Sequence, residues 1–368
     1  MSTTKINIVL FGIGNVGSAL ISQIVTSQSF FLEKHNIALR IPIITNSTLA
    51  FFEKNGVQNE WETNFKKSAV PFRTSDIIDY VREQNLENLI AVDATASSEI
   101  TKWYIPLVQN GFNIVAANKK ANTLHFDFYK ELRQNLVQFD KQFHYETNVG
   151  GGLPVIQTIR DLHYSGERIT KIKGVFSGSM SYIFNRFSSE ESSFSTILAD
   201  AEKIGLTEPD SREDLSGKDV ARKLLILARE LELQVELSDV QTESLLLPNL
   251  NEKHSKADYA INKSFFDNRY QIAKITQTDG YVLRYIGELQ VDTKKLEVKL
   301  VSVSNASPLG QLKGADNLIE IYTKSYGALP VIIQGAGAGK EVTARGMLTD
   351  ILRISEKIQV QVHHYQKI

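Results

Sequence analysis

The first part of the chain alternates short apolar runs with stretches in which apolar residues recur at helical spacing. The apolar runs have the length of buried strands and lie at residues 6–11, 39–44, 89–95 and 113–117. The helical stretches lie at residues 18–26, 76–84 and 103–110. Strands that alternate with helices in this way are typical of a parallel sheet covered by helices. The pattern therefore predicts an α/β domain of the Rossmann type at residues 1–150.

The pattern changes beyond residue 150. Further helices are predicted at residues 155–162, 194–204 and 216–233, and strands at residues 169–176, 281–287, 296–303 and 317–323. These elements predict an α+β region at residues 151–334. Residues 330–341 resemble a second glycine loop, and a helix is predicted at residues 342–354. We expect this helix to pack back on the first domain, so that residues 335–368 complete it.

A glycine-rich turn lies between the first predicted strand and the first predicted helix. It consists of Gly12, Ile13, Gly14, Asn15, Val16 and Gly17. Gly12 permits a tight turn, Gly14 lets the backbone approach a pyrophosphate, and Gly17 brings the helix close to the strand. The N-terminus of the helix adds amide donors for the phosphates. The turn predicts binding of NAD or NADP, and the alternative is a glycine turn that serves packing alone.

Other strands of this domain also end in polar residues, at the edge where a dinucleotide binds. Thr95 is either a cofactor contact or a cap of the following helix. Lys119 either points toward the nicotinamide, as the surrounding elements favour, or is an ordinary surface lysine. Gly339 and Glu341 lie in a segment expected to close over the cofactor. The second strand ends in Thr-Asn-Ser at residues 45–47, without the acid that usually accepts from the ribose 2′-hydroxyl of NAD. That ending favours NADP, or the use of both cofactors.

Residues 205–223 combine acidic residues in a predicted loop with the start of a helix. Asp219 and Lys223 are four positions apart, so on a helix they share a face. A carboxylate beside an amine is suited to hold an ammonium-bearing substrate while the lysine moves a proton. The alternative is a solvated turn and a capped helix, because Ser216 and Asp219 have the spacing of a capping box.

Composition narrows the classes of function. The net charge of -1 offers no basic surface for nucleic acid, and the seven histidines do not cluster at metal-ligand spacing. The chain has no cysteine, which excludes disulfides and any mechanism with a thiol nucleophile. No apolar run reaches the roughly twenty residues of a membrane span, and no signal peptide opens the chain. We therefore expect a cytoplasmic protein that acts on a small molecule.

Three glycines and a proline at residues 150–154 closely follow Glu146. Their irregular backbone could turn carbonyl groups inward, and together with the Glu146 carboxylate these could coordinate a hard cation through oxygen alone. The alternative is a hinge between domains, with Glu146 in a salt bridge.

Together these motifs resemble the homoserine dehydrogenase family. The resemblance is carried by residues 12–17, 117–120, 146–154, 205–223 and 335–341. It implies NAD(P)H-dependent interconversion of L-aspartate 4-semialdehyde and L-homoserine, a step in threonine, methionine and isoleucine biosynthesis. It also implies a homodimer in which the late strands form the sheet of the dimer. The expected form is monofunctional, without an aspartate kinase domain or a regulatory ACT domain.

The resemblance also implies roles for single residues. Lys223 would donate and accept the proton, and Lys119 would lie near substrate and nicotinamide. The substrate loop would use Gly205, Glu208, Asp214 and Asp219, with Glu208 and Asp219 holding the ammonium and Asp214 supporting the pocket. A structural sodium ion would be held by the Glu146 carboxylate and by the backbone carbonyls of Val149, Gly151 and Leu153.

One position departs from the family pattern, and two rival functions stay open. Ser211 stands where the family usually has a proline, so the substrate loop is expected to be looser. A non-catalytic NAD(P)-binding regulatory protein would keep the glycine turn and lose the chemistry. A dehydrogenase of another small amino or hydroxy acid would keep both.

Overall fold

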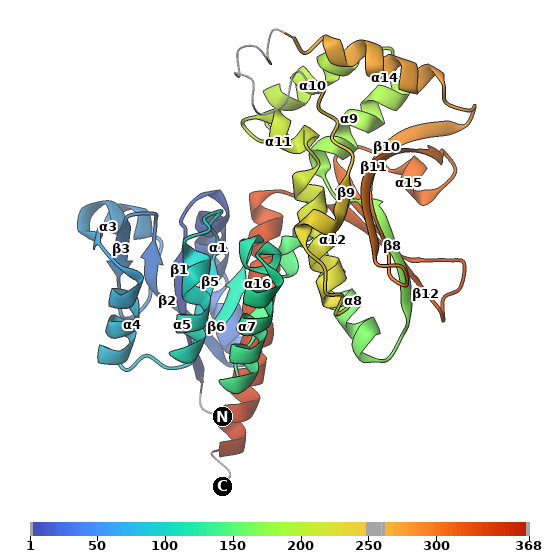
Figure 1. Ribbon diagram of the computed structural model, residues 1–368. Coiled ribbons are helices and arrows are strands. Elements are labelled where there is room, and N and C mark those ends of the chain that lie inside the picture. Colours follow the sequence, from blue (N-terminus) through green and yellow to red (C-terminus); the bar gives the residue numbers. More distant parts are fainter. Residues whose placement is uncertain (1–2, 248–258, 260–261, 366–368) are drawn as a thin grey trace. The chain divides into compact units, whose positions relative to one another are not determined.

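The structure, a computed structural model, describes residues 3–247, 259 and 262–365. The chain forms two compact units (Figure 1). The first unit comprises residues 1–152 and 339–368, and the second comprises residues 153–338. The chain therefore enters the second unit once, leaves it once, and ends in the first.

The first unit is built on a seven-stranded sheet in the order β4-β3-β2-β1-β5-β6-β7. Its parallel strands are β1 (Thr4–Phe11), β2 (Ile37–Thr45), β5 (Leu89–Asp93), β6 (Asn113–Ala116) and β7 (Phe143–His144). The edge strands β3 (Leu49–Phe52) and β4 (Val70–Pro71) are antiparallel. Alternate residues of β1 enter hydrophobic clusters on the two faces of the sheet, which explains its continuous apolar sequence.

Helices cover both faces of this sheet (Figure 1). They are α1 (Asn15–Thr26), α2 (Gln28–His35), α3 (Trp61–Ser68), α4 (Thr74–Glu83), η1 (Ile100–Trp103), α5 (Tyr104–Gln109), α6 (Lys120–Thr123), α7 (Phe126–Gln138), η2 (Glu146–Asn148) and α16 (Lys340–Tyr365). Helix α16 packs along α1, and Ala344, Met347 and Ile351 are fully buried in the shared core. The last helix therefore belongs to the first unit.

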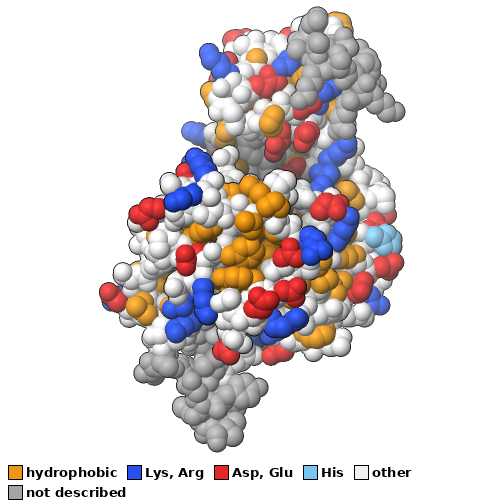
Figure 2. Space-filling view, turned by 90° about the vertical axis from the view of Figure 1, so that its left-hand side faces the viewer, with side chains coloured by type: hydrophobic (Ala, Val, Ile, Leu, Met, Phe, Trp, Pro, Cys, Tyr) orange, Lys and Arg blue, Asp and Glu red, His pale blue; other side chains and the backbone are white. Residues whose placement is uncertain are grey.

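One face of the first unit carries both hydrophobic and charged side chains. Figure 2 shows a band of hydrophobic side chains there, flanked by charged ones. Separately, Val70 on the edge strand β4 is about half exposed.

Among the described residues, none of the helices is both long enough and apolar enough to span a lipid bilayer.

The second unit is built on a six-stranded sheet in the order β13-β12-β8-β10-β11-β9. The strands are β8 (Ile169–Val175), β9 (Val240–Thr242), β10 (Tyr281–Gln290), β11 (Lys295–Ser304), β12 (Asp316–Thr323) and β13 (Val331–Ala336). Neighbouring strands are antiparallel except β9 and β11. The α/β fold class, with a parallel-sheet domain and a second sheet domain, is confirmed.

The helices of the second unit pack against this sheet and against one another. They are α8 (Val155–Tyr164), α9 (Gly178–Ser189), α10 (Phe194–Lys203), α11 (Ser211–Leu215), α12 (Lys218–Glu230), η3 (Leu237–Asp239), α14 (Phe265–Ile275) and α15 (Pro308–Gln311). Aromatic rings join α9, α10 and α14, and the rings of Phe194 and Tyr270 stack at 4.1 Å. Helices α9 and α12 both pack on β10. This packing fixes α12, which carries the predicted site residues Asp219 and Lys223.

Several local predictions are wrong. The loop predicted before residue 216 contains the short helix α11, and residues 331–336, predicted as part of a glycine loop, form strand β13. Helix α12 begins at Lys218, because Gly217 at φ 72° ends the preceding turn in a left-handed conformation. Asp219 therefore does not cap the helix, and the Ser216 hydroxyl instead donates to the Glu213 carbonyl at 2.7 Å. The predicted strand at residues 89–95 ends at Asp93.

Candidate functional site

The glycine turn of the first unit is shaped by close backbone contacts. Gly12 has φ 93°, and its N–H donates to the Thr45 carbonyl at 2.9 Å. A Cβ on Gly17 would lie 1.9 Å from the Gly12 carbonyl oxygen. A Cβ on Gly14 would instead meet no atom within 4 Å. The turn is thus packed tightly from within and open to the outside at Gly14, as the approach of a pyrophosphate requires.

The start of α1 lacks a side-chain cap. Gly14 is the N-cap residue and makes no side-chain cap, and the first turn carries no acid. Ile13 and Val16 pack against the core, and Asn15 is exposed. Because the first N–H groups of a helix need an acceptor, this terminus is suited to bind a phosphate.

The end of β2 forms a tight turn into β3. The Asn46 side-chain oxygen accepts from the backbone N–H groups of Thr48 and Leu49 at 2.9 and 2.7 Å. Ser47 and Thr48 are exposed at the tip. The turn therefore presents hydroxyl groups and no carboxylate where a cofactor ribose is expected.

Two further predicted cofactor residues follow β5 and β6. The Thr95 hydroxyl oxygen accepts from the Ser97 N–H at 3.2 Å, so Thr95 also stabilises its own turn. Lys119 directly precedes α6 and is half-buried. Both residues are tied to the buried carboxylate of Asp93, either directly or through Asn118.

The start of α16 is held beside α1. Gly339 has φ 121°, and a Cβ there would meet no atom within 4 Å. The Gln23 side-chain amide donates to the Glu341 carbonyl at 3.0 Å and to its carboxylate at 3.2 Å. Gly339 and Glu341 thus belong to the same unit as the glycine turn.

In the second unit, Lys223 is a buried amine with two oxygen partners. Its residue is 9 % exposed, and its Nζ donates to the Phe176 carbonyl at 2.7 Å. The Asp219 carboxylate lies 2.7 Å from the same nitrogen. These contacts use two of the three hydrogens of an ammonium group. The amine is therefore held in one orientation, with a hydrogen left to donate.

An acidic pocket of about 470 Å³ lies beside this pair. It is lined by Ser177, Glu208, Asp210, Arg212, Glu213, Asp214, Ser216, Lys218, Asp219, Val220 and Arg222. The structure thus brings Glu208, Asp214 and Asp219 to one pocket. Gly205, at φ 71°, ends the preceding helix and is exposed outside this lining.

Asp214 organises the wall of the acidic pocket. Its carboxylate accepts from the Ser179 hydroxyl at 2.6 Å and from the Glu208 N–H at 2.8 Å. Burial raises the pKa of Asp214, and the two donors act in the opposite direction. The Glu208 side chain is exposed, whereas its backbone is fixed by Asp214.

The predicted cation segment begins in η2. The Glu146 carboxylate is buried and lies 3.5 Å from the Arg353 guanidinium. The backbone N–H of Glu146 donates to the Asp350 carboxylate at 2.9 Å. Gly150 and Gly151 have φ 80° and 63°. Among the described residues, no group of three or more histidines or acids could hold a metal. A cation here would therefore depend on backbone carbonyls, which hard cations accept.

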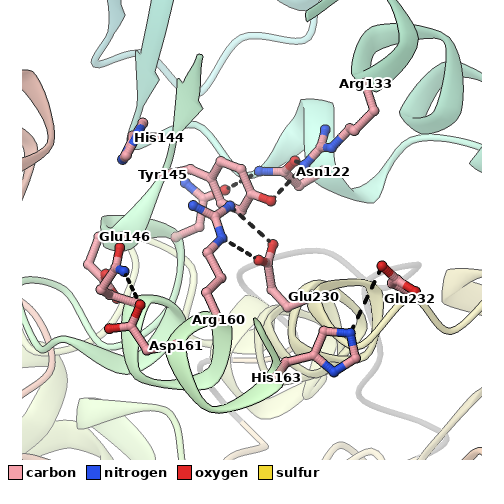
Figure 3. A network of polar contacts seen from close by, with 12 residues as sticks. Asn122, Arg133, His144, Tyr145, Glu146, Arg160, Asp161, His163, Glu230 and Glu232 are labelled. Atoms are coloured by element: carbon pink, nitrogen blue, oxygen red, sulfur yellow. Dashed lines mark hydrogen bonds and ion pairs between the residues drawn. The ribbon is translucent and has the colours of Figure 1, made fainter. Parts of the chain in front are cut away.

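Figure 3 shows polar contacts near this segment and, separately, within the second unit. In the first unit, the Arg133 guanidinium donates to the Tyr145 hydroxyl at 2.7 Å and to Asn122 at 2.8 Å. In the second unit, Arg160 pairs with Glu230 at 2.6 Å and joins α8 to α12. The Arg133 contacts hold Tyr145, the residue before Glu146. The Arg160–Glu230 ion pair holds the C-terminal end of α12, the helix that carries Lys223.

Comparison with known proteins places the chain. Residues 154–352 match the family model for homoserine dehydrogenase, and residues 12–146 match the homoserine dehydrogenase NAD binding domain. The chain belongs to the homoserine dehydrogenase family. The homoserine dehydrogenase of Saccharomyces cerevisiae is 36% identical over 363 residues, which cover 97% of this chain and 100% of that protein.

Other relatives are longer or known by structure alone. The bifunctional aspartokinase/homoserine dehydrogenase of Haemophilus influenzae is 37% identical over 95% of this chain, but the match covers 42% of that protein. The chain thus spans about two fifths of the length of the bifunctional relatives it matches. A Candida auris protein of unknown function has a crystal structure with a TM-score of 0.87 and 32% identity, covering 96% of this chain and 99% of that one.

The sequence analysis missed several groups that lie at or next to the predicted site residues. They are the Phe176 carbonyl, Ser177 and Ser179 before and within α9, and the buried residues Asp93 and Asn118. Ser177 caps α9, and Ser179 reaches Asp214. The small polar residues at the start of α9 were the available signal, whereas nothing local marks a backbone carbonyl as a lysine partner.

Proposed function

We propose that the chain is an NAD(P)-dependent homoserine dehydrogenase that reduces L-aspartate 4-semialdehyde to L-homoserine and catalyses the reverse reaction. One observation carries this beyond family membership. The buried Lys223 amine is held between the Phe176 carbonyl and Asp219, and Asp219 lines an acidic pocket with Glu208 and Asp214. This arrangement suits a substrate with an ammonium group and a reaction that moves one proton.

The first unit is proposed to bind the dinucleotide. The open position at Gly14 and the start of α1, which no side chain caps, fit a pyrophosphate. The rest of the cofactor would be surrounded by Thr95, Lys119, Gly339 and Glu341. The turn after β2 offers Ser47 and Thr48 in place of a carboxylate, so we propose that NADP or NAD is accepted. When bound, the nicotinamide supplies or takes the hydride.

The acidic pocket is proposed to hold the amino end of the substrate. Glu208 and Asp219 would accept from the ammonium, and charge-assisted hydrogen bonds of this kind are among the stronger polar contacts. Asp214 would support them indirectly, because it holds the Glu208 N–H and the Ser179 hydroxyl. Gly205 lets the chain turn into the loop that carries Glu208.

Lys223 is proposed as the general acid and base. As hydride reaches the aldehyde carbon, negative charge grows on the carbonyl oxygen, and a nearby ammonium both stabilises that charge and gives up a proton to it. In the reverse direction the neutral amine would take the proton of the homoserine hydroxyl. Asp219 and the Phe176 carbonyl orient the amine for either direction, and Lys119 would add positive potential near the nicotinamide.

We further propose a structural sodium ion, a homodimer and a cytoplasmic location. The sodium ion would be held by the Glu146 carboxylate and the carbonyls of Val149, Gly151 and Leu153, an oxygen-only set that suits a hard cation.

The dimer would form through the strands of the second unit. In support, the sheet carries alternating charges, with Lys299 2.7 Å from Glu297 and 3.4 Å from Glu288. Such a face can complement a second copy of itself.

A direct assay tests the proposed function. Purified protein is mixed with L-homoserine and NADP or NAD at alkaline pH, and the absorbance of the reduced cofactor is followed. We expect reduction with at least one cofactor, and little with 4-hydroxybutyrate, which lacks the amino group that the acidic pocket would bind. Nucleotide binding without turnover would favour a regulatory protein. Equal rates with both substrates would indicate a dehydrogenase of hydroxy acids.

A further inference from the structure

Asp93 is a buried carboxylate at the centre of the first unit. It is the last residue of β5, is 2 % exposed, and pairs in register with Ala116 at the end of β6. One carboxylate oxygen accepts from the Thr95 N–H at 2.8 Å. The other accepts from the Tyr104 hydroxyl at 2.7 Å and from the Asn118 side-chain amide at 2.9 Å. A single side chain therefore joins the turn that follows β5, the first residue of α5 and the segment that follows β6.

The charge of Asp93 is balanced by neutral donors. Burial raises its pKa, whereas the hydrogen bonds from Tyr104, Thr95 and Asn118 favour the ionised form. Burial and, after it, the neighbouring Asp93 carboxylate raise the pKa of the Tyr104 phenol well above its usual value, so the phenol stays a donor. Among the described residues, Asp93 forms no ion pair with a lysine, arginine or histidine. Its three donors are therefore what make a buried carboxylate tolerable here.

Two of these donors lead to predicted cofactor contacts. The methyl group of Thr95 faces the glycine turn, and a Cβ on Gly12 would lie 2.8 Å from it. Asn118 donates also to the Ser97 carbonyl at 2.7 Å, and its oxygen accepts from the Lys120 N–H at 3.0 Å. Lys119 lies between these two anchored residues. The positions of Thr95 and Lys119 thus both depend on one carboxylate.

We propose that Asp93 is a positioning residue for the cofactor site. It does not touch the nucleotide, but it fixes the segments at residues 94–97 and 117–120 in the arrangement that binds it. This inference rests on the proposed function, because the two segments matter only if the first unit binds a dinucleotide. In metal sites, residues that orient the direct ligands typically change affinity by about 10- to 100-fold when they are replaced, and we expect an effect toward the lower end of that range here.

The test uses Asp93→Asn, with Tyr104→Phe as the matched control. Asn at position 93 keeps the size of the side chain but presents an NH₂ group to donors, so at least one contact must break. Tyr104→Phe removes one hydrogen bond from the same carboxylate and leaves Thr95 and Asn118 in place. Amide hydrogen exchange of the full-length protein without nucleotide and NADPH affinity by fluorescence titration are both measured.

We expect faster exchange at residues 94–97 and 117–120 in Asp93→Asn than in either Tyr104→Phe or the wild type. NADPH affinity is expected to fall at least tenfold in Asp93→Asn and less than threefold in Tyr104→Phe, with the KM for L-homoserine changed less than threefold. Unchanged exchange in both segments would overturn the role of Asp93, as would equal loss of NADPH affinity in the two variants.

Two further results keep the inference separate from the proposed function and from a folding defect. A wild-type protein that binds no NADPH would contradict the proposed function, while the exchange data would still decide whether Asp93 orders the two segments. If Asp93→Asn does not fold, Asn118→Ala replaces it, since it leaves Asp93 in place and removes the Asn118 contacts with Asp93, the Ser97 carbonyl and the Lys120 N–H. We then expect faster exchange at residues 117–120 and at least a threefold loss of NADPH affinity, and wild-type values for both would overturn the inference.

Discussion

The glycine turn of the first unit and the acidic pocket of the second unit are built by different means. The glycine turn is made of backbone, and its shape follows from side chains that are missing at Gly12, Gly14 and Gly17. The acidic pocket is made of charged side chains that become neighbours only because α9, α11 and α12 pack as they do. A site made of backbone can be recognised from a short sequence motif, whereas a site made of side chains depends on how distant elements pack. The two should therefore respond differently to substitution.

The largest effect among the substitutions that probe this contrast is expected for Gly14→Ala. Its Cβ would meet no protein atom, so the fold should tolerate it, but it would occupy the space proposed for the pyrophosphate. NADPH affinity is expected to fall at least about tenfold, or 1.4 kcal/mol, in a fluorescence titration. Gly17→Ala is the matched control.

Gly17→Ala should lose stability, whereas Gly14→Ala should lose NADPH affinity. A Cβ on Gly17 would lie 1.9 Å from the Gly12 carbonyl, and overpacking of this kind costs about 1–3 kcal/mol of stability. Denaturant unfolding should therefore show a clear loss for Gly17→Ala and little for Gly14→Ala. If Gly14→Ala binds NADPH with wild-type affinity, the nucleotide does not pass over this turn as proposed.

A smaller effect is expected for Asp219→Asn in the acidic pocket. The amide oxygen can still accept from Lys223, but the charge that would attract the substrate ammonium is lost. We expect the KM for L-homoserine to rise about fivefold, or about 1 kcal/mol, with the KM for NADP nearly unchanged. Steady-state kinetics with each substrate varied in turn measures both. A larger effect on NADP than on homoserine would contradict the division of roles.

Cofactor choice should depend on the turn after β2. Ser47→Asp would add a carboxylate at the exposed tip, where it could accept from the ribose 2′-hydroxyl of NAD and would repel the 2′-phosphate of NADP. We expect the ratio of kcat/KM for NADP to that for NAD to fall about threefold or more, a little under 1 kcal/mol. An unchanged ratio would show that the ribose lies elsewhere. Ser165, an exposed serine at the end of α8, is a control position for the same substitution.

The smallest effect is a pH dependence at Asp214. Because burial raises its pKa above the ordinary value of 3.8, ionised Asp214 costs stability in the folded protein. This cost is absent below the pKa of the unfolded chain and fully present above the raised pKa of the folded one. The stability of the wild type relative to Asp214→Asn should therefore fall as pH rises through that window. Urea unfolding at several pH values measures it, and a rise with pH would contradict the sign.

The same contrast explains what the sequence could predict. The parallel strands could be predicted because both of their faces are buried, which makes their sequences continuously apolar. The turn at residues 12–17 could be predicted because each of its three glycines meets a different steric requirement. Asp219 and Lys223 were paired correctly, since helical spacing alone decides that contact. Asp93 was missed, because its partners Tyr104 and Asn118 come from other elements. The start of α12 was misplaced, because a capping-box spacing at Ser216 concealed the left-handed turn at Gly217.

The central claim is that Lys223 performs proton transfer and takes no part in nucleotide binding. The most direct measurement is kcat for L-homoserine oxidation by Lys223→Ala, together with its NADPH affinity on the same preparation. We predict that kcat falls at least about 100-fold, the scale of a lost general acid, while NADPH affinity stays within threefold of the wild type. A near-normal kcat would remove Lys223 from the mechanism, and a parallel loss of NADPH affinity would contradict the separation of the two sites.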